Sequence, residues 1–147
     1  MEAEISALAA RLGMAARLVH IPYLDSPAEI YRAFDAFILT SRYEAGWPIV
    51  VLEALASNLP VIVAACPGTS NISQGGLSHC WTAEIGDPAG FVRAIESWLQ
   101  DAPNHRTINH RQIAEQRFST EVLFDAVLQL YVHGVNPRFS CERKSET

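Results

Sequence analysis

At 147 residues the chain is long enough to form one domain around a hydrophobic core, and about half of its residues (49%) are apolar. A net charge of −5 with 11 basic residues argues against binding to nucleic acid through a basic surface, and no apolar run approaches membrane-spanning length. The acidic N-terminus does not resemble a secretory signal and the three cysteines lack metal-ligand spacing, so we expect a cytoplasmic protein with reduced thiols and no metal site.

The first third of the chain predicts a helix, a strand and a second helix. Apolar residues at helical spacing and a closing glycine place the first helix at residues 4–12. The run RLVHI predicts a strand over residues 17–21, in which we expect His20 to be a buried structural histidine. Ser26 is followed by a proline and then by a glutamate three positions on, a capping-box pattern that predicts a helix to about residue 33.

The middle of the chain predicts a strand, a loop, a helix and a second strand. Short apolar runs without alternation, at 37–39 and 61–64, are typical of parallel strands that are covered on both faces. Between them, Pro48 fits the first helical position because its missing N–H costs nothing there. Asn58 can take the left-handed conformation that ends a helix, and the proline two residues later prevents the helix from continuing.

The last third predicts one weak strand and three helices before a polar tail. The strand covers residues 80–85, and the helices cover residues 87–100, 104–117 and the segment that begins at Ser119. Inward positions are expected in the first of these helices at Phe91, Ile95, Trp98 and Leu99, and in the last at Val122, Leu123, Val127, Leu130 and Tyr131. We expect one domain over residues 1–133 and a disordered tail over residues 134–147.

Glu53 is the one charged residue in the apolar stretch PIVVLEALA of the predicted central helix. A carboxylate in apolar surroundings is costly unless another group pairs with it or hydrogen-bonds to it. Helix starts after parallel strands attract anions, and ligands of open α/β sheets bind beyond the carboxyl ends of the strands. A carboxylate there accepts hydrogen bonds from the hydroxyl groups of a sugar or a ribose, so this pattern predicts a nucleotide or sugar-phosphate pocket. The alternative is a carboxylate that only complements the helix dipole.

The stretch SRYEAGWPIVVLEALASNLPV resembles the signature of the retaining glycosyltransferases of family 4. In that family an acidic residue is followed, after seven residues, by a second acid that runs into Glu-Ala-x-Ala and Pro-Val. The match is good from Glu53 to Val61, whereas one extra residue separates Glu53 from the upstream acid, Glu44. The resemblance implies an α/β fold with a Rossmann-like parallel sheet and flanking helices, as in an incomplete C-terminal half of a GT-B fold.

The resemblance also assigns roles to individual residues. Glu53 would hold the ribose hydroxyls of the nucleotide, and Glu44, which we assign as the catalytic residue, would hold hydroxyls of the transferred sugar; the alternative for Glu44 is a solvated loop acid. The remaining substrate-binding residues are expected in two loops, at Ser41, Ala45, Gly46 and Trp47 and at Gly68 and Thr69. Trp47 has packing as its alternative role, and the serine, threonine and second glycine have local turn formation.

The same resemblance implies that the chain begins after the opening strand–helix–strand of the donor domain, which in the family supplies the basic residues that bind the diphosphate. Arg42 and Arg17 are the nearby candidates for that role. The first hypothesis is the donor half of a hexosyl-transferring enzyme, without cofactor and inactive alone, which binds a nucleotide diphosphate sugar and relies on an acceptor-domain polypeptide or on self-association. The second is a non-catalytic binding or interaction module. A receiver domain lacks support, because the acidic cluster it requires is not visible.

Overall fold

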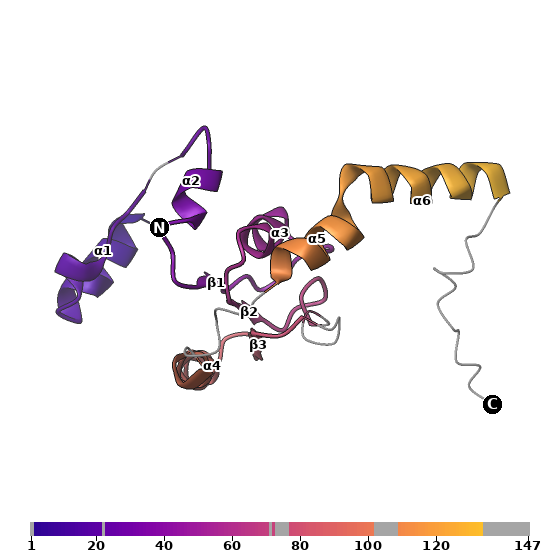
Figure 1. The fold of residues 1–147 in the computed structure, drawn as a ribbon. Coiled ribbons are helices and arrows are strands. Elements are labelled where there is room, and N and C mark those ends of the chain that lie inside the picture. Colours follow the sequence, from indigo (N-terminus) through magenta and orange to yellow (C-terminus); the bar gives the residue numbers. More distant parts are fainter. Residues whose placement is uncertain (1, 22, 71, 73–76, 102–108, 134–147) are drawn as a thin grey trace, which may run out of the picture.

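The computed structural model describes residues 2–21, 23–70, 72, 77–101 and 109–133, which form a three-stranded parallel sheet with helices on both faces (Figure 1). The predicted α/β, Rossmann-like class is therefore confirmed. The elements in chain order are α1 (Glu2–Arg11), the 3-10 helix η1 (Ala15–Arg17), α2 (Ala28–Tyr31), β1 (Phe37–Leu39), α3 (Ile49–Ala56), β2 (Val61–Ala64), β3 (Cys80–Ala83), α4 (Pro88–Asp101), α5 (His110–Phe118) and α6 (Thr120–His133).

The sheet has the order β1-β2-β3, with Phe37 opposite Val61 and Val61 opposite Cys80. All four residues of β2 are buried, because α3 covers one face of the sheet and α4 covers the other (Figure 1). This double coverage explains why the strand is apolar along its whole length instead of alternating. The predicted strands 37–39 and 61–64 are confirmed, and the predicted strand 80–85 is confirmed in its first four residues.

The ends of α3 follow the local chemistry of its sequence with one correction. Pro48 has an extended conformation (φ −64°, ψ 134°) and precedes the helix as its N-cap, so its predicted place at the first helical position is wrong by one residue. Asn58 has φ +58°, as predicted, and the amide of Leu59 donates a hydrogen bond to the carbonyl of Ala54 (3.0 Å). The side chain of Asn58 also accepts a hydrogen bond from the amide of Arg111 (2.8 Å), which caps α5 from another part of the fold.

The hydrophobic core lies between the sheet and the layer of α3 and α5. Helix α3 contributes fully buried Val51 and Leu55, which pack with Val61 and Val63 of the central strand. Helix α5 adds Ala114 to the same cluster, and Tyr31 adds its ring from the end of α2. The core therefore holds α2, α3 and α5 in fixed positions relative to one another.

The N-terminal segment differs from the prediction beyond its first helix. Helix α1 is confirmed and Gly13 follows it with φ +69°, but residues 17–21 form the end of η1 and an irregular segment instead of a strand. The exposed fraction of Val19 is 78%, because no strand of the described structure lies beside this segment. His20 is exposed and contacts Glu2 (2.9 Å), so the prediction of a buried histidine is wrong. Helix α2 ends at Tyr31, two residues before the predicted end.

The C-terminal helices are present, but their predicted inward faces are only partly correct. In α4 the buried positions are Gly90 and Ala94, and Leu99 is exposed. In α6 all five residues of the predicted inward stripe are exposed, because among the described elements this helix contacts only α5 and projects away from the sheet (Figure 1). Ser119 accepts a hydrogen bond from the amide of Val122 (3.3 Å), which confirms it as the cap of α6.

Two predictions concern residues outside the described ranges. The first part of the predicted helix 104–117 and the whole tail 134–147 belong to them. The described part of the first prediction is α5, which begins at His110. Within the described chain, no helix combines the length and the apolar character that a bilayer crossing requires.

Candidate functional site

Glu53 is a half-buried residue of α3, and its carboxylate is hydrogen-bonded to a neighbouring helix. The hydroxyl of Tyr31, the last residue of α2, donates to Oε2 of Glu53 at 2.9 Å. The same hydroxyl lies 3.4 Å from the carbonyl oxygen of Val50. Burial, and then the hydrogen bond and the charge of Glu53, raise the pKa of Tyr31 to about 12. Sequence reasoning did not find this partner, since no local pattern links residues 31 and 53.

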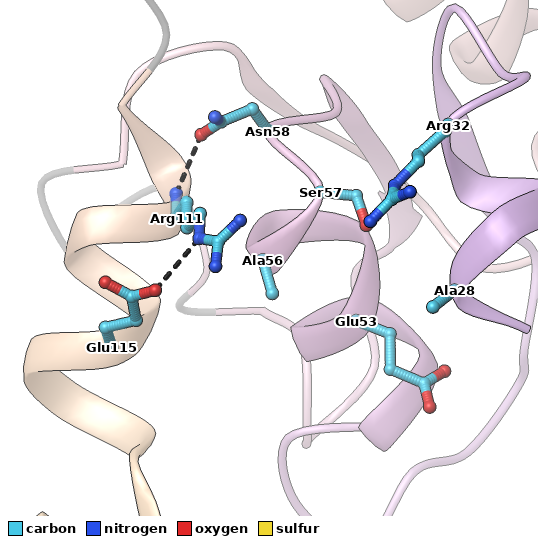
Figure 2. A pocket seen from close by; sticks show the side chains of 8 residues that line it. All are labelled: Ala28, Arg32, Glu53, Ala56, Ser57, Asn58, Arg111 and Glu115. Carbon is cyan, nitrogen blue, oxygen red and sulfur yellow. Dashed lines mark hydrogen bonds and ion pairs between the residues drawn. The ribbon is translucent and has the colours of Figure 1, made fainter.

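Glu53 lines a cavity of about 350 Å³ between α2, α3 and α5 (Figure 2). Its charged lining comes from two sides. Arg32, directly after α2, and Glu53 of α3 lie on one side. Arg111 and Glu115 of α5 lie on the other side and form an ion pair at 2.9 Å. Guanidinium, hydroxyl, amide and carboxylate groups together can bind a ligand that carries both hydroxyl and anionic groups. The other lining residues are Ala28, Ala56, Ser57 and Asn58.

A second cavity, of about 290 Å³, lies between α3 and α5 and also includes Glu53. Its other walls are mostly apolar, from Ile49 and Leu52 of α3 to Ala114 and Phe118 of α5. Glu53 therefore stands at the border of two hollows, one polar and one apolar. The polar cavity is lined by the end of α3, at residues 56–58, whereas sequence analysis expected a ligand at the start of this helix, beyond the carboxyl ends of the strands.

The loops that follow β1 and β2 are in backbone contact. A Cβ atom added to Gly68 would lie 2.1 Å from the carbonyl oxygen of Gly46 and 2.8 Å from the Cβ of Glu44. Only a residue without a side chain fits there. The structure thus brings together Glu44, Gly46 and Gly68, which sequence analysis had placed in two separate loops.

The other predicted loop residues have different surroundings. Trp47 packs on the ring of Phe118, with ring centroids 4.8 Å apart, an arrangement that favours a packing role. Thr69 is buried; its hydroxyl donates to the carbonyl of Ala64 and its amide donates to the carbonyl of Cys66 (2.9 Å), which favours turn formation. Ser41 is half-buried and Ala45 is exposed.

A third cavity, of about 360 Å³, lies beyond the carboxyl ends of β1 and β3. Thr40 and Arg42 line it from the loop after β1, and Gly86 to Pro88 line it from the start of α4. Asp87, in this wall, forms an ion pair with Arg93 at 3.0 Å. Arg17, the other predicted partner for a diphosphate, instead lines an apolar cavity beside α1.

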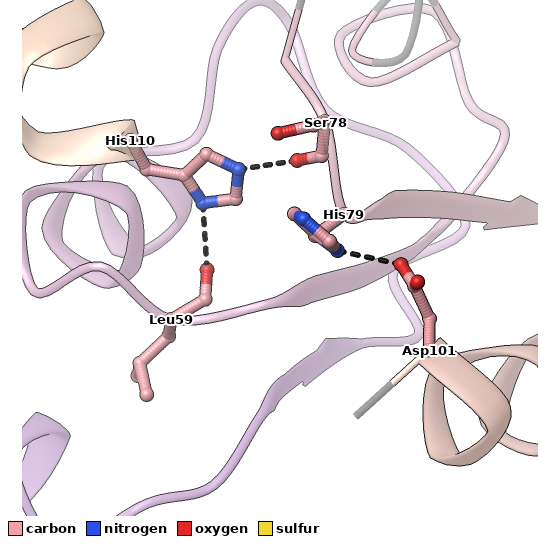
Figure 3. A network of polar contacts seen from close by, with 5 residues as sticks. All are labelled: Leu59, Ser78, His79, Asp101 and His110. Carbon is pink, nitrogen blue, oxygen red and sulfur yellow. Dashed lines mark hydrogen bonds and ion pairs between the residues drawn. The ribbon is translucent and has the colours of Figure 1, made fainter. Parts of the chain in front are cut away.

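His110 is a central part of the fold, although no local pattern in the sequence indicates this role (Figure 3). The imidazole is fully buried, with Nδ1 2.9 Å from the carbonyl oxygen of Leu59 and Nε2 in contact with the carbonyl oxygen of Ser78. Carbonyl oxygens only accept hydrogen bonds, so a ring nitrogen that carries a proton donates to the carbonyl oxygen that it faces. His110 thereby joins α5 to the segments that enter β2 and β3.

Comparison with known proteins places this geometry in a family context. The family model of the glycosyl transferases of group 1 matches residues 1–101. A lipopolysaccharide core biosynthesis glycosyltransferase of Rhizobium meliloti is 31% identical over 127 residues, which are 84% of this chain and 36% of the relative. A D-inositol 3-phosphate glycosyltransferase of Geodermatophilus obscurus is 36% identical over 98 residues, which are 65% of this chain and 21% of the relative. A lipopolysaccharide core biosynthesis mannosyltransferase of Rhizobium meliloti is 25% identical over 133 residues, which are 88% of this chain and 38% of the relative. The chain thus spans between 21% and 38% of the length of these relatives.

Proposed function

The chain belongs to the group 1 glycosyl transferases, and we propose that it binds a nucleotide diphosphate sugar as the donor half of a retaining, family 4 enzyme with the GT-B fold. The observation that carries the proposal is the setting of Glu53. This acid stands on the helix of the family-like stretch, half-buried, at the border of a cavity that contains guanidinium and hydroxyl groups. A carboxylate in this position accepts hydrogen bonds from the ribose hydroxyls of the nucleotide.

The loops at the carboxyl ends of the strands hold the rest of the donor. Glu44 and Gly46 lie against Gly68, so an acid and two glycine backbones are available to the transferred sugar. Arg42, which lines the cavity at the start of α4, contributes positive charge for the diphosphate. Positive charge and helix N–H groups stabilise the leaving diphosphate as its negative charge increases in the transition state.

The acceptor comes from elsewhere. The chain spans only 21–38% of the length of its relatives, so we place acceptor binding on another polypeptide region or on a partner chain. One of these relatives is named a mannosyltransferase and two act, by name, in lipopolysaccharide core biosynthesis. A nucleotide diphosphate hexose is accordingly the first donor to test.

Calorimetric titration with UDP-glucose, UDP-N-acetylglucosamine and GDP-mannose tests the proposal. We expect the chain to bind at least one of these donors and Glu53→Gln to weaken that binding at least tenfold. Glu115→Gln is the matched control, because this acid lines the same cavity but already forms an ion pair with Arg111. Absence of binding to all three donors, or equal effects of the two substitutions, would contradict the proposal.

A second function, a non-catalytic interaction module, is favoured by the edge of the sheet. Strand β1 pairs with β2 on one side and with no described strand on the other, and Ile38 is exposed. Unpaired edges with apolar side chains promote association with another chain. Under this alternative the chain forms a stable dimer or complex by light scattering and binds no donor in the titration.

A further inference from the structure

We propose that Tyr31 is a positioning residue for donor binding: its hydroxyl holds one oxygen of the Glu53 carboxylate so that the other oxygen faces the ribose hydroxyls. The inference rests on the proposed function, and it assigns a residue outside the family-like stretch to the same site. It starts from the 2.9 Å hydrogen bond between the Tyr31 hydroxyl and Oε2 of Glu53.

The tyrosine is fixed by packing before any ligand arrives. Its exposed fraction is 5%, and its ring contacts Phe34 edge-on at 6.2 Å and Phe37 at 5.9 Å between centroids. Both aromatic partners restrict rotation of the ring, so the position of the hydroxyl is set by the core. A hydroxyl group whose position is fixed by the core can restrict, through its hydrogen bond, a flexible acidic side chain on the neighbouring helix.

The hydroxyl has one proton and two nearby acceptors. The carboxylate oxygen of Glu53 is at 2.9 Å and the carbonyl oxygen of Val50 is at 3.4 Å, so the shorter and charge-assisted bond to Glu53 is the stronger one. Because the pKa of Tyr31 is raised to about 12, the hydroxyl keeps its proton throughout the physiological range. The hydroxyl of Tyr31 therefore donates a hydrogen bond to Glu53 throughout this pH range.

The bond leaves one oxygen of Glu53 available. Within the described parts of the chain, no residue donates a hydrogen bond to Oε1 of Glu53, and Glu53 is one of the residues that line the cavity between α2, α3 and α5. An isolated glutamate side chain samples many rotamers, and ordering it on binding costs conformational entropy. Because the hydrogen bond from Tyr31 already orders this side chain in the free protein, less conformational entropy is lost on binding, and a pre-organised site gains affinity in this way.

The competing interpretation is a purely structural bond that ties α2 to α3. The two interpretations differ in a double-mutant cycle measured on donor affinity. If Tyr31 acts through Glu53, Tyr31→Phe weakens binding in the wild-type background but has no further effect once Glu53→Gln is present. If the bond is only structural, the affinity of Tyr31→Phe equals that of the wild type, whatever happens to its melting temperature.

The experiment is calorimetric titration with the tightest-binding donor of the panel and with its 2′-deoxyribose analogue. We expect Tyr31→Phe to bind the donor about tenfold more weakly, the loss of one charge-assisted hydrogen bond, and to discriminate less between the donor and the analogue. Glu53→Asp, which keeps the charge but withdraws it from the tyrosine by one methylene, should also bind more weakly. Tyr131→Phe is the control, since this tyrosine is exposed on α6.

The outcomes separate the two proposals. Two outcomes would overturn the role of Tyr31 and leave the proposed function standing, provided that the wild type binds the donor. In the first, Tyr31→Phe binds the donor as tightly as the wild type. In the second, Tyr31→Phe loses the same affinity in the wild-type and Glu53→Gln backgrounds. Absence of donor binding by the wild type overturns the proposed function, and the role of Tyr31 with it.

Discussion

Gly68 approaches Gly46 so closely that a single methyl group cannot be placed between them: a Cβ atom on Gly68 would lie 2.1 Å from the carbonyl oxygen of Gly46. The obstacle is backbone, which cannot rotate away as a side chain can. The contact joins the loops after two neighbouring strands, β1 and β2. The geometry of the loop that contains Glu44 therefore depends on a glycine in the other loop.

Substitution of Gly68 by alanine should force these loops apart. We expect Gly68→Ala to lower the free energy of unfolding by about 2 kcal/mol, the range of an overpacked site, and to weaken donor binding. Gly46→Ala is the matched control for stability, because a Cβ atom there meets no atom within 4 Å. Urea unfolding of both variants measures the difference, and equal stability of the two would contradict the contact.

Asn58 combines two tasks that substitution can separate. Its backbone has φ +58°, which alanine adopts only with strain, and its side chain caps α5 through the amide of Arg111. Asn58→Ala should lose both contributions, about 2 kcal/mol in total. Asn58→Gly keeps the backbone conformation and should lose only the cap, about 1 kcal/mol. Urea unfolding checks this order; a glycine variant less stable than the alanine variant would refute it.

The burial of Tyr31, together with its hydrogen bond to Glu53, predicts a loss of stability at alkaline pH. The tyrosine ionises near pH 10 when unfolded and near pH 12 in the fold, so the fold holds the proton more tightly. Its contribution is complete below pH 10 and is lost as the pH rises through 12, by about 1.4 kcal/mol at pH 11. Tyr31→Phe should lack this part of the slope, whereas Tyr131→Phe should keep it. Identical slopes in urea titrations at pH 9 and pH 11 for wild type and Tyr31→Phe would rule it out.

From the contacts of His110 we expect a large loss of stability when the imidazole is replaced by an apolar ring. His110→Phe removes both ring nitrogens, so the carbonyl oxygens of Leu59 and Ser78 lose their contacts with the imidazole. We expect a loss of about 2 kcal/mol in the free energy of unfolding, because the carbonyl oxygen of the buried Leu59 is left without this partner. His20→Phe is the control, because His20 is exposed; a change above about 0.5 kcal/mol there would remove the contrast.

The part of the fold that sequence reasoning predicted well is the part encoded locally. The unit from β1 to β2 has apolar strands without alternation, a proline before the helix and a left-handed asparagine after it. Each of these signals depends on residues within a few positions of one another. The acid on α3 was found in the same way, because a charge in an apolar stretch is a local anomaly.

The errors and omissions all involve contacts between distant residues. The segment 17–21 has the composition of a strand, but composition does not supply a neighbouring strand, and the segment remains irregular. The stripe of α6 is apolar in the sequence, yet it meets no described element other than α5. Tyr31 and Glu53 are 22 positions apart, and His110 and Leu59 are 51 apart, so neither pair leaves a periodic signal.

The position of His110 affects where this polypeptide can be divided for expression. A clone that stopped at the end of α4 would contain all three strands, but the carbonyl groups at the entrances to β2 and β3 would lose the side chain that joins them, and the core would lose Ala114. The smallest unit worth producing in a laboratory therefore extends at least to Phe118.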